Sequence, residues 1–349
     1  MNGRRVLVTG HTGFKGGWLA LWLRELGADV TGLALPPATE PNFFGQVRLG
    51  ELVTHVEGDI RDDTLVAQVV ADCRPDIVFH LAAQPLVRAS YADPVATYAT
   101  NVMGTVHVLE ACRAVDSVKA IVCVTSDKCY ENREWAWPYR ESDPMGGHDP
   151  YSSSKGAAEL AIASWRRSFF GEGALVASAR AGNVIGGGDW AEDRLVPDLI
   201  RAMIAGEAPA IRSPGSVRPW QHVLDALAGY LALGELLLAV DRSATTGWNF
   251  GPSADDSRPV SWIADRLVER WGGPDWQAQD GPRPHEATLL SLDSSRARRE
   301  LGWRPALCLE EALAMVVDWH RAVADGADAR AVSTGQLRAY GATNEVERV

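Results

Sequence analysis

Cysteines are too few and too scattered in this sequence to form a disulfide framework or a metal centre. The five are Cys73, Cys112, Cys123, Cys129 and Cys308, and no two of them form a C-x-x-C pair. Structural zinc sites and disulfide scaffolds both use cysteines at characteristic spacings. An odd, scattered set is typical of reduced thiols in a cytoplasm. We therefore expect a cytoplasmic protein without a metal site.

Positive charge and long apolar runs are also scarce. Lys and Arg number 34 against 45 Asp and Glu, a formal net charge of -11, which argues against a broad basic surface for nucleic acid. The most apolar stretch, "ALAGYLALGELLLAV", carries Glu235 and is too short to span a bilayer. The first residues, "MNGRRVLVTGHTG", interrupt their apolar run with glycine and polar residues, unlike a signal peptide. We expect neither nucleic-acid nor membrane partners.

What the sequence does contain is an alternation of short apolar runs and helical patterns. The runs that predict strands lie at 4–10, 29–35, 52–60, 75–83, 118–126 and 174–182, and the helical patterns at 14–27, 62–73, 93–115 and 151–170. Such alternation indicates the α/β class, with a Rossmann-type doubly wound parallel sheet. Because the crossovers are right-handed, the carboxyl ends of the strands form one edge.

The alternation weakens after about residue 186. Segments such as "GSVRPWQHV" and "TTGWNFGP" are short and rich in Trp, Pro and Arg. They predict a smaller C-terminal lobe over 186–325 that covers the sheet edge, beside a Rossmann-type domain over 1–185 to which segments at about 220–250 return. Residues 326–349 are polar and weakly patterned, which predicts a tail.

A glycine-rich turn, "TGHTGFKG", follows the first strand and opens the first helix. Gly10, Gly13 and Gly16 recur every three residues, and residues without a Cβ allow a pyrophosphate to approach the helix amides. This position predicts a dinucleotide site. Asp59, after the third strand, could bind the adenine amino group or cap the next helix. The second strand ends in "LALPP", without the residues that distinguish NAD from NADP.

Two groups of reactive side chains are expected at the carboxyl edge of the predicted sheet. Tyr151 and Lys155 are four residues apart, hence on one helix face, and a nearby ammonium favours a phenolate base. Alone, such a pair is more often two exposed side chains. Ser126, Asp127 and Lys128 directly follow the apolar run "AIVCV". Charges beside a buried strand are costly unless they are paired or used, although a solvated turn is an alternative.

The motifs "TGHTGFKG", "GDI", "HLAAQ", "TNVMGT", "TSDK" and "YSSSK" resemble, in this order, the extended short-chain dehydrogenase/reductases that act on nucleotide sugars. The longer stretches "TSDKCYEN", "RAGNVIGGGDWAEDRLVPD" and "LLSLDSSRARRELGW" are similar to those of the CDP-glucose 4,6-dehydratases within that family. The resemblance covers the chain to about residue 320. It implies NAD as the cofactor and a role in deoxysugar biosynthesis, including that of lipopolysaccharide or O-antigen.

The resemblance also implies a reaction with two stages. Tyr151 and NAD would oxidise C4 of the sugar, with Lys155 tuning the tyrosine and holding the nicotinamide ribose, and with Ser126 binding the C4 hydroxyl. Lys128 would then remove the C5 proton and Asp127 would protonate the departing C6 hydroxyl. These roles require a neutral Lys128 and a protonated Asp127, which a dry site favours.

Further positions are implied in the same way. The cofactor would contact Gly10, Thr12, Gly13, Phe14, Lys15, Gly16, Asp59, Ile60, Leu81, Ala82, Ala83, Thr100, Tyr151 and Lys155. The nucleotide sugar, CDP-glucose, would contact Gln84, Asn183, Arg194, Leu195, Arg218, Asn249, Arg283 and His285. Arg194 and Arg218 suit phosphate oxygens, whereas selectivity for cytosine rests on the resemblance only.

Alternatives remain open. Another nucleotide-sugar 4,6-dehydratase or a 4-epimerase would share the oxidation, but an epimerase has no task for Asp127 and Lys128. A non-catalytic NAD-binding regulator would need none of Ser126, Tyr151 and Lys155. The resemblance further implies a homodimer or homotetramer, in which helices at 95–114 and 151–170 pack against a second copy.

Overall fold

The structure, a computed structural model, describes residues 1–279 and 289–346. Its centre is a seven-stranded sheet of order β10-β6-β5-β4-β1-β2-β3, in which neighbouring strands are parallel. The predicted Rossmann-type sheet is thereby confirmed. Its strands are β1 (Arg5–Thr9), β2 (Asp29–Ala34), β3 (Thr54–Glu57), β4 (Ile77–His80), β5 (Ala120–Val124), β6 (Leu175–Ala181) and β10 (Gly247–Phe250).

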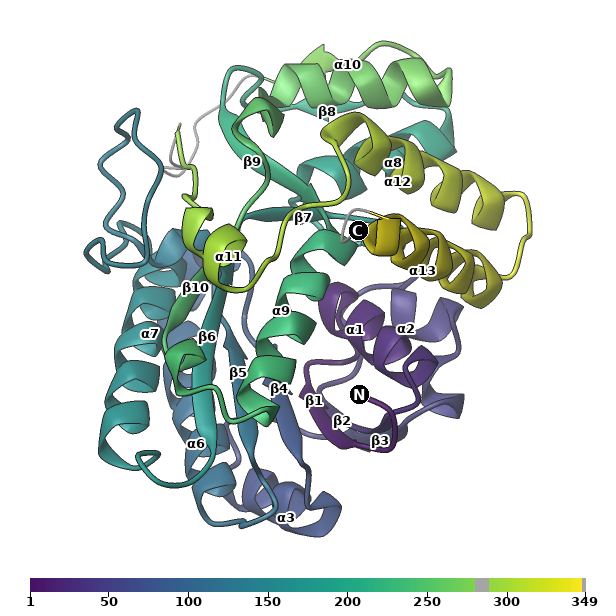
Figure 1. Ribbon diagram of the computed structural model, residues 1–349. Coiled ribbons are helices and arrows are strands. Elements are labelled where there is room, and N and C mark those ends of the chain that lie inside the picture. The colour runs from purple at the N-terminus through teal and green to yellow at the C-terminus, as the bar shows by residue number, and fades with distance from the viewer. Residues whose placement is uncertain (280–288, 347–349) are drawn as a thin grey trace.

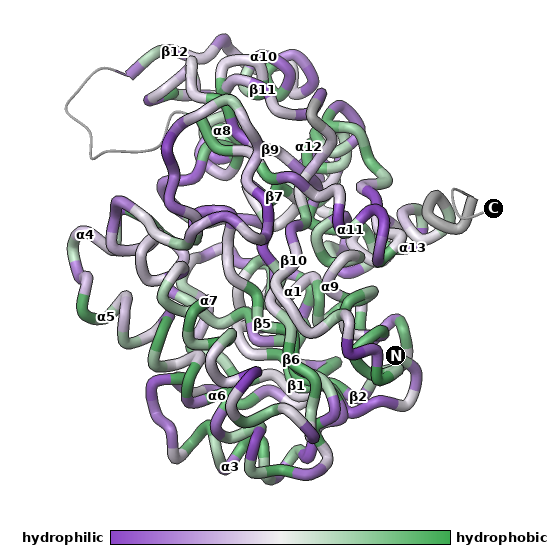
Figure 2. The backbone as a smooth tube through the Cα atoms, turned by 60° about the vertical axis from the view of Figure 1, so that its left-hand side comes forward, coloured by the Kyte–Doolittle hydropathy of each residue, from purple (hydrophilic) through white to green (hydrophobic). Residues whose placement is uncertain are grey.

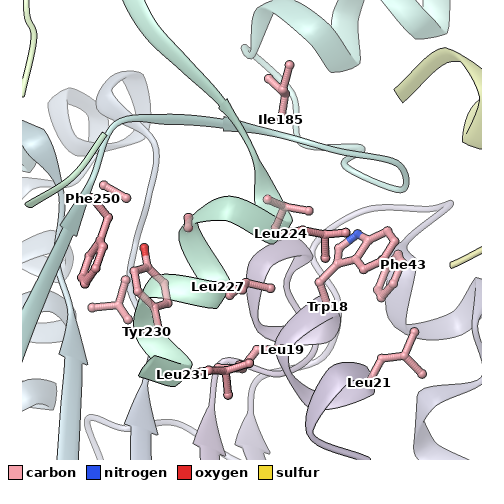
Figure 3. Close-up of a cluster of buried hydrophobic side chains, with 14 of the residues drawn as sticks. Trp18, Leu19, Leu21, Phe43, Ile185, Leu224, Leu227, Tyr230, Leu231 and Phe250 are labelled. Carbon is pink, nitrogen blue, oxygen red and sulfur yellow. The ribbon is translucent and has the colours of Figure 1, made fainter. Parts of the chain in front are cut away.

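Helices cover both faces of this sheet (Figure 1). Helices α1 (Phe14–Glu25) and α9 (Val223–Leu238) lie on one face, and α3 (Asp63–Cys73), α6 (Gly104–Arg113) and α7 (Pro150–Ser168) on the other. Successive strand residues point to opposite faces, so Val6 and Val8 belong to one buried cluster and Leu7 to the other. Figure 3 shows Leu19 of α1 and Leu231 of α9 meeting in the first cluster.

The helical pattern predicted at 93–115 forms three consecutive segments. Asp93 caps α5 (Pro94–Tyr98) by accepting a hydrogen bond from the Ala96 amide at 2.9 Å. A π-helical turn, η2 (Ala99–Met103), then leads into α6. Wide turns of this kind are frequent at functional sites, and this one carries Thr100, which faces the cleft described below.

The smaller lobe lies beyond the carboxyl edge of the sheet (Figure 1). Three short strands form its main sheet, and a two-stranded pair and three helices complete it. These are β7 (Asn183–Ile185), β9 (Val217–His222), β11 (Ser257–Pro259), the pair β8 (Ala210–Ile211) and β12 (Gln277–Ala278), and α8 (Leu195–Ala205), α10 (Val260–Trp271) and α12 (Leu309–Ala324). In Figure 2 hydrophilic segments run across the molecule between the sheet and this lobe.

The segment after β9 returns to the domain that contains the large sheet. Helix α9 packs against β5 and β6, and β10 forms the edge of the large sheet beside β6. The remaining short elements are α2 (Phe43–Gln46), α4 (Val87–Ala92), α11 (Ser295–Glu300), η1 (Leu49–Glu51), η3 (Asp127–Cys129), η4 (Arg242–Ala244) and η5 (Ala254–Asp256). No helix in the described ranges is both long and apolar enough to cross a bilayer.

The prediction of a weakly patterned tail is wrong for residues 329–346, which form helix α13 (Ala329–Val346). The ring of Tyr340 is buried 5.6 Å from that of Trp22 in α1, and its hydroxyl donates to Asp225 Oδ1 at 2.9 Å. Ser333 accepts a hydrogen bond from Trp319 Nε1 at 2.8 Å. The helix is stabilised by these tertiary contacts, because its own sequence shows only a weak apolar stripe.

Candidate active site

A cleft of about 580 Å³ lies between the carboxyl edge of the sheet and the lobe. Its walls come from the turn after β1, the segments after β2, β3, β4 and β5, the start of α7, and lobe segments around β7 and α8. The strand order reverses between β1 and β4. Ligand sites of open α/β sheets lie at such a switch point.

The turn after β1 packs so closely against neighbouring backbone that only glycine fits at two of its positions. A Cβ on Gly16 would lie 2.1 Å from the Gly10 carbonyl oxygen, and one on Gly10 would lie 2.7 Å from the Ala82 amide nitrogen. Gly10 also has a φ of 79°, which favours glycine. Gly13, at the N-cap of α1, has no side chain to cover the first-turn amides. The turn therefore fits a dinucleotide pyrophosphate at the helix N-terminus.

Asp59 follows β3 and lines the same cleft as the glycine turn. Arg61 Nε donates to its carboxylate at 2.8 Å, and this hydrogen bond holds the pKa of Asp59 below its ordinary value. The helix α3 is capped by Asp62, which accepts from the Leu65 amide at 3.0 Å. The N-cap alternative for Asp59 is therefore wrong. Thr12 donates to the Leu35 carbonyl at 2.8 Å, which ties the segment after β2 to the turn.

The predicted cofactor residues all face this one cleft. They are Gly10, Thr12, Gly13, Phe14, Lys15, Gly16, Asp59, Ile60, Leu81, Ala82, Ala83, Thr100, Tyr151 and Lys155. They come from the turn after β1, the segments after β3 and β4, the π-helical turn and α7. Parallel strands bring these segments to one edge although they are far apart in sequence.

The two reactive groups meet at the other end of the cleft, below the lobe. Ser126 lies at the end of β5 and hydrogen-bonds the Tyr151 hydroxyl. The Ser126 hydroxyl also donates to Asp127 Oδ1 at 2.9 Å and accepts from the Lys128 amide at 3.2 Å. Lys155 follows Tyr151 by one helical turn, and all five side chains line the cleft.

The start of α7 is held so that Tyr151 faces the cleft. Asp149 caps the helix by accepting from the Ser152 amide and hydroxyl at 2.9 and 2.6 Å. Pro150 occupies the first helical turn, where its fixed φ suits a helix start. The Tyr151 amide donates to the Ser90 hydroxyl of α4 at 3.1 Å. These contacts set the height of the tyrosine above the sheet edge.

Burial is the largest cause of the pKa shifts of Asp127, Tyr151 and Lys155. It raises the pKa of Asp127 above the ordinary range, against the lowering effects of Lys128 and Ser126. The Oδ2 atom of this buried carboxyl has no hydrogen-bond partner among the described residues. A carboxylic acid in such a place favours its protonated form. The direction therefore agrees with the expected role of Asp127 as an acid.

The expected acidification of Tyr151 is not what the structure shows. Burial raises the pKa of Tyr151 to about 12, although the hydrogen bond between its hydroxyl and that of Ser126 lowers it. Burial likewise lowers the pKa of Lys155 to about 8. Desolvation therefore outweighs the attraction that an adjacent ammonium exerts on a phenolate.

Four of the predicted substrate residues line the lobe side of the cleft: Asn183, Arg194, Leu195 and Arg218. Arg194 Nη1 lies 3.3 Å from Asp189 Oδ2. Arg218 Nη1 donates to the Val217 carbonyl at 3.0 Å. Two guanidinium groups in one cleft match the charge of a diphosphate. Arg283 and His285 lie outside the described residues.

Asn249 and Gln84 are not among the residues that line the cleft, and their assignment to the substrate stays a prediction. Asn249 is fully buried, its Oδ1 accepts from Tyr130, and its Nδ2 donates to the Tyr139 and Asp293 carbonyls at 2.9 and 3.2 Å. Gln84 lies behind the cleft lining and donates to Thr97 Oγ1 at 2.9 Å. Both side chains have hydrogen-bond partners within the protein, which hold the neighbouring backbone in place.

Charged residues at the mouth of the cleft were missed by the sequence analysis. Asp193 accepts from Arg88 of α4 at 3.0 Å and from Arg212 of the lobe at 2.7 Å, and all three line the cleft. Isolated arginines and acids in loops carry no spacing that would have indicated this pairing. No group of three or more His, Cys, Asp or Glu in the described part of the chain is placed to bind a metal ion.

Known proteins resemble the chain over nearly its whole length. A family model described as the NAD dependent epimerase/dehydratase family matches residues 6–241. A CDP-glucose 4,6-dehydratase of Salmonella typhimurium is 50% identical over 345 residues, covering 97% of this chain and 96% of that protein. A dTDP-glucose 4,6-dehydratase of Xanthomonas campestris is 29% identical over 334 residues, covering 90% and 92%.

Solved structures resemble the fold as well. A UDP-glucose 4-epimerase of Thermotoga maritima with UDP-glucose gives a TM-score of 0.81 at 25% identity, covering 93% of this chain and 99% of that one. A UDP-glucose 4-epimerase of Thermus thermophilus in complex with NAD gives a TM-score of 0.78 at 25% identity, covering 91% and 99%.

Proposed function

The chain belongs to the NAD-dependent epimerase/dehydratase family, and from this premise we propose that it is a CDP-glucose 4,6-dehydratase. It converts CDP-D-glucose to CDP-4-dehydro-6-deoxy-D-glucose with loss of water. The observation that carries the proposal is the buried Asp127, with its raised pKa, beside Lys128, Ser126 and Tyr151 in one cleft. The similarity to the Salmonella enzyme supports the choice of CDP-glucose.

The glycine turn and the N-terminus of α1 would hold NAD, which when bound would supply the hydride acceptor for C4 and the hydride donor for C6. Tyr151 takes the proton of the C4 hydroxyl, and Ser126, hydrogen-bonded to Tyr151, orients that hydroxyl. Lys155 holds the nicotinamide ribose and, as an ammonium, favours the phenolate of Tyr151 while it carries the charge. Its pKa of about 8 leaves it mostly charged near neutral pH.

The elimination uses the other two side chains. Once C4 is a ketone, the neighbouring C5 proton is acidic, and Lys128 removes it as the general base. Asp127 donates its proton to the C6 hydroxyl, which leaves as water. Positioned acids and bases contribute typically about 10²–10⁴-fold to such proton transfers. Lys128 then returns its proton to C5 as the hydride reaches C6, and the proton taken from the C4 hydroxyl replaces the one that Asp127 gave. The balance is one water lost and no net oxidation.

The acid–base pair distinguishes this function from its alternatives. A 4-epimerase, as two of the similar structures are named, oxidises C4 and then reduces it, which leaves Asp127 and Lys128 without a task. A non-catalytic NAD-binding regulator would have no use for a hydrogen-bonded Ser126 and Tyr151 beside Lys155. We also propose that Arg194 and Arg218 hold the sugar diphosphate and that Asn183 contacts the sugar nucleotide.

We further propose that the chain assembles with a second copy as a homodimer or as a homotetramer built from such dimers. Large apolar side chains are exposed on α5, η2 and α7 and at the residue after α7, namely Val95, Tyr98, Met103, Leu160 and Phe169. Exposed apolar surface supports an interaction site where such side chains adjoin. Light scattering after size exclusion measures the mass. Cytoplasmic location and a role in lipopolysaccharide or O-antigen synthesis stay predictions.

The decisive experiment offers the protein with NAD four substrates in parallel: CDP-, dTDP-, UDP- and GDP-glucose. We expect a 4-keto-6-deoxy product, detected by ketone absorbance in alkali, from CDP-glucose and without net NADH. Deuterium placed at C4 should be recovered at C6 of the same molecule. A product that is the C4 epimer would overturn the proposal in favour of an epimerase, and turnover of another nucleotide only would overturn the choice of CDP.

A further inference from the structure

Glu159 continues the row of side chains that Tyr151 and Lys155 begin on α7. The three residues follow one another at four-residue intervals, so they share one helix face. All are buried, and Glu159 is only 4% exposed. Tyr151 and Lys155 line the cleft, whereas Glu159 lies one turn further along the helix, behind the lining. A buried carboxylate beside two reactive residues needs an explanation.

The Glu159 carboxylate ties α7 to the ends of two strands. Its Oε1 accepts a hydrogen bond from the Thr125 hydroxyl. Its Oε2 accepts from the Ser178 hydroxyl at 2.8 Å and from Arg180 Nη2 at 2.7 Å. Ser178 and Arg180 belong to β6, and Thr125 directly precedes the Ser126-Asp127-Lys128 segment after β5. The contact therefore connects the helix that carries Tyr151 to the segment that carries the proposed acid and base.

Arg180 is held in a fixed position as the partner of this charge. Its Nη1 donates to the Tyr130 hydroxyl at 2.7 Å, and its guanidinium lies 5.2 Å from the centroid of that ring. A Cβ on Gly247 of β10 would come within 2.3 Å of Arg180 Nη2, so the neighbouring strand leaves room for the guanidinium. A buried charge is tolerated when it is paired in this way.

Among the anions that act on Lys155, Glu159 is the one that is ionised at neutral pH. Burial lowers the pKa of Lys155 to about 8, and negative charge at Cys129, Glu159 and Cys123 opposes this. Burial raises the pKa of both thiols, that of Cys123 to about 12, so they stay neutral. Burial would also raise the pKa of Glu159, but Arg180 and the three hydrogen bonds hold it below its ordinary value.

Two further groups face Lys155 from other elements. His80 of β4 has its pKa lowered to about 3 by burial, so it is neutral in the working range. Lys15 of α1 has its pKa lowered to about 8, first by burial and then by the charges of Arg194 and Lys155. Lys15 therefore titrates in the same range as Lys155 and repels it, and a test must separate the two lysines.

We propose that Glu159 is a positioning residue for C4 oxidation: it holds Thr125, and with it the Ser126-Asp127-Lys128 segment, against α7, and it supplies the anion that keeps Lys155 an ammonium. This role rests on the proposed function, because it acts through Lys155 and Tyr151. It assigns the Glu159–Arg180 pair to the reaction as well as to the stability of the fold.

The test compares three variants with the wild type. Glu159→Gln keeps the shape and an oxygen for Thr125 but removes the charge. Glu159→Gln combined with Arg180→Met removes both charges, so the interior holds no unpaired arginine if the single variant fails to fold. Ser178→Ala, the matched control, removes one hydrogen bond to Oε2 and leaves the charge in place.

Two measurements are made across pH 6 to pH 10 for each variant. The first is the affinity for NAD, followed by tryptophan fluorescence, which needs no sugar. The second is the rate of NADH formation with CDP-xylose, which has the glucose configuration but no C6 and so stops after oxidation. In the wild type we expect both to fall as pH rises past about 8. Loss of Glu159 should move this fall down by about one pH unit, which is a roughly fivefold loss at pH 8 and approaches tenfold only at higher pH.

The controls decide what each result means. Ser178→Ala should leave the midpoint in place, and Lys15→Gln as a background should leave the Glu159→Gln shift unchanged if the shift belongs to Lys155. An unchanged midpoint in both folded variants that lack Glu159 overturns the proposal. If the wild type binds NAD but oxidises no CDP-sugar, the proposed function fails, and the affinity measurement still tests Glu159 independently.

Discussion

Replacing Asp127 by Asn should separate the two stages of the reaction. The side chain is 2% exposed, and its Oδ1 accepts from Ser126 at 2.9 Å. Asn has nearly the same shape and offers an oxygen to that hydrogen bond. The substitution therefore removes a proton donor and leaves the packing in place. Oxidation at C4, which uses Tyr151 and Ser126, should persist.

The expected size of the effect follows from the role of the residue. A positioned general acid contributes about 10²–10⁴-fold, which corresponds to about 3–5 kcal/mol on the elimination barrier. Turnover of CDP-glucose should fall by that factor in Asp127→Asn. NADH, which is transient in the wild type, should instead accumulate towards one equivalent per site, because the hydride has no acceptor until water leaves.

The assay is stopped-flow absorbance of NADH after mixing with CDP-glucose, paired with detection of the keto product. Asp189→Asn is the matched control, since Asp189 is a second buried carboxyl in the same cleft that contacts Arg194. It should alter KM without trapping NADH. If Asp127→Asn formed product at the wild-type rate, or if it lost NADH formation as completely as product formation, the assignment of Asp127 to the elimination would be refuted.

Other substitutions test the cofactor turn, a buried acid and Asn249. Gly16→Ala places a methyl 2.1 Å from the Gly10 carbonyl oxygen. We expect a loss of about 1–3 kcal/mol of stability from overpacking and weaker NAD binding in a titration. An unchanged NAD affinity would contradict the geometry. Burial raises the pKa of Asp225 to about 7, so the protonated form is favoured in the folded state and stability falls as pH rises from about 4 to 7, by about 4 kcal/mol. Asp225→Asn should flatten that pH dependence of the melting temperature, and a slope equal to that of the wild type would show that Asp225 is ionised throughout. Asn249→Ala should cost about 1–3 kcal/mol by leaving buried partners unsatisfied while KM for CDP-glucose is unchanged, whereas a raised KM in a stable variant would support Asn249 as a substrate residue.

Much of the site was predictable because its residues are marked by local spacing. Gly10 and Gly16 are recognisable from a three-residue pattern after an apolar run, and Tyr151 and Lys155 from a four-residue interval. The carboxyl ends of parallel strands meet at one edge, so these separate motifs could be placed together without coordinates. The same rule placed the segment after "AIVCV" opposite the tyrosine.

Other features depend on contacts between residues that are distant in sequence. Asn249 and Gln84 are polar residues near expected motifs, and the structure adds hydrogen bonds from them to Tyr130, Tyr139 and Thr97 that no local pattern indicates. Helix α13 was missed because Tyr340 and Ser333 are stabilised by α1, α9 and α12 rather than by the periodicity of their own segment. The pairing of Glu159 with Arg180 likewise joins α7 to β6.

The sequence by itself determined the class of fold, the position of the glycine turn and the identity of the reactive side chains, because these depend on short-range patterns and on the general geometry of parallel sheets. Only the tertiary structure decided which polar residues face the cleft and how strongly each holds its proton. Burial is a property of the packed chain: it raises the pKa of Tyr151 to about 12 and lowers that of Lys155 to about 8, and no spacing of residues along the chain reports how much water remains around them.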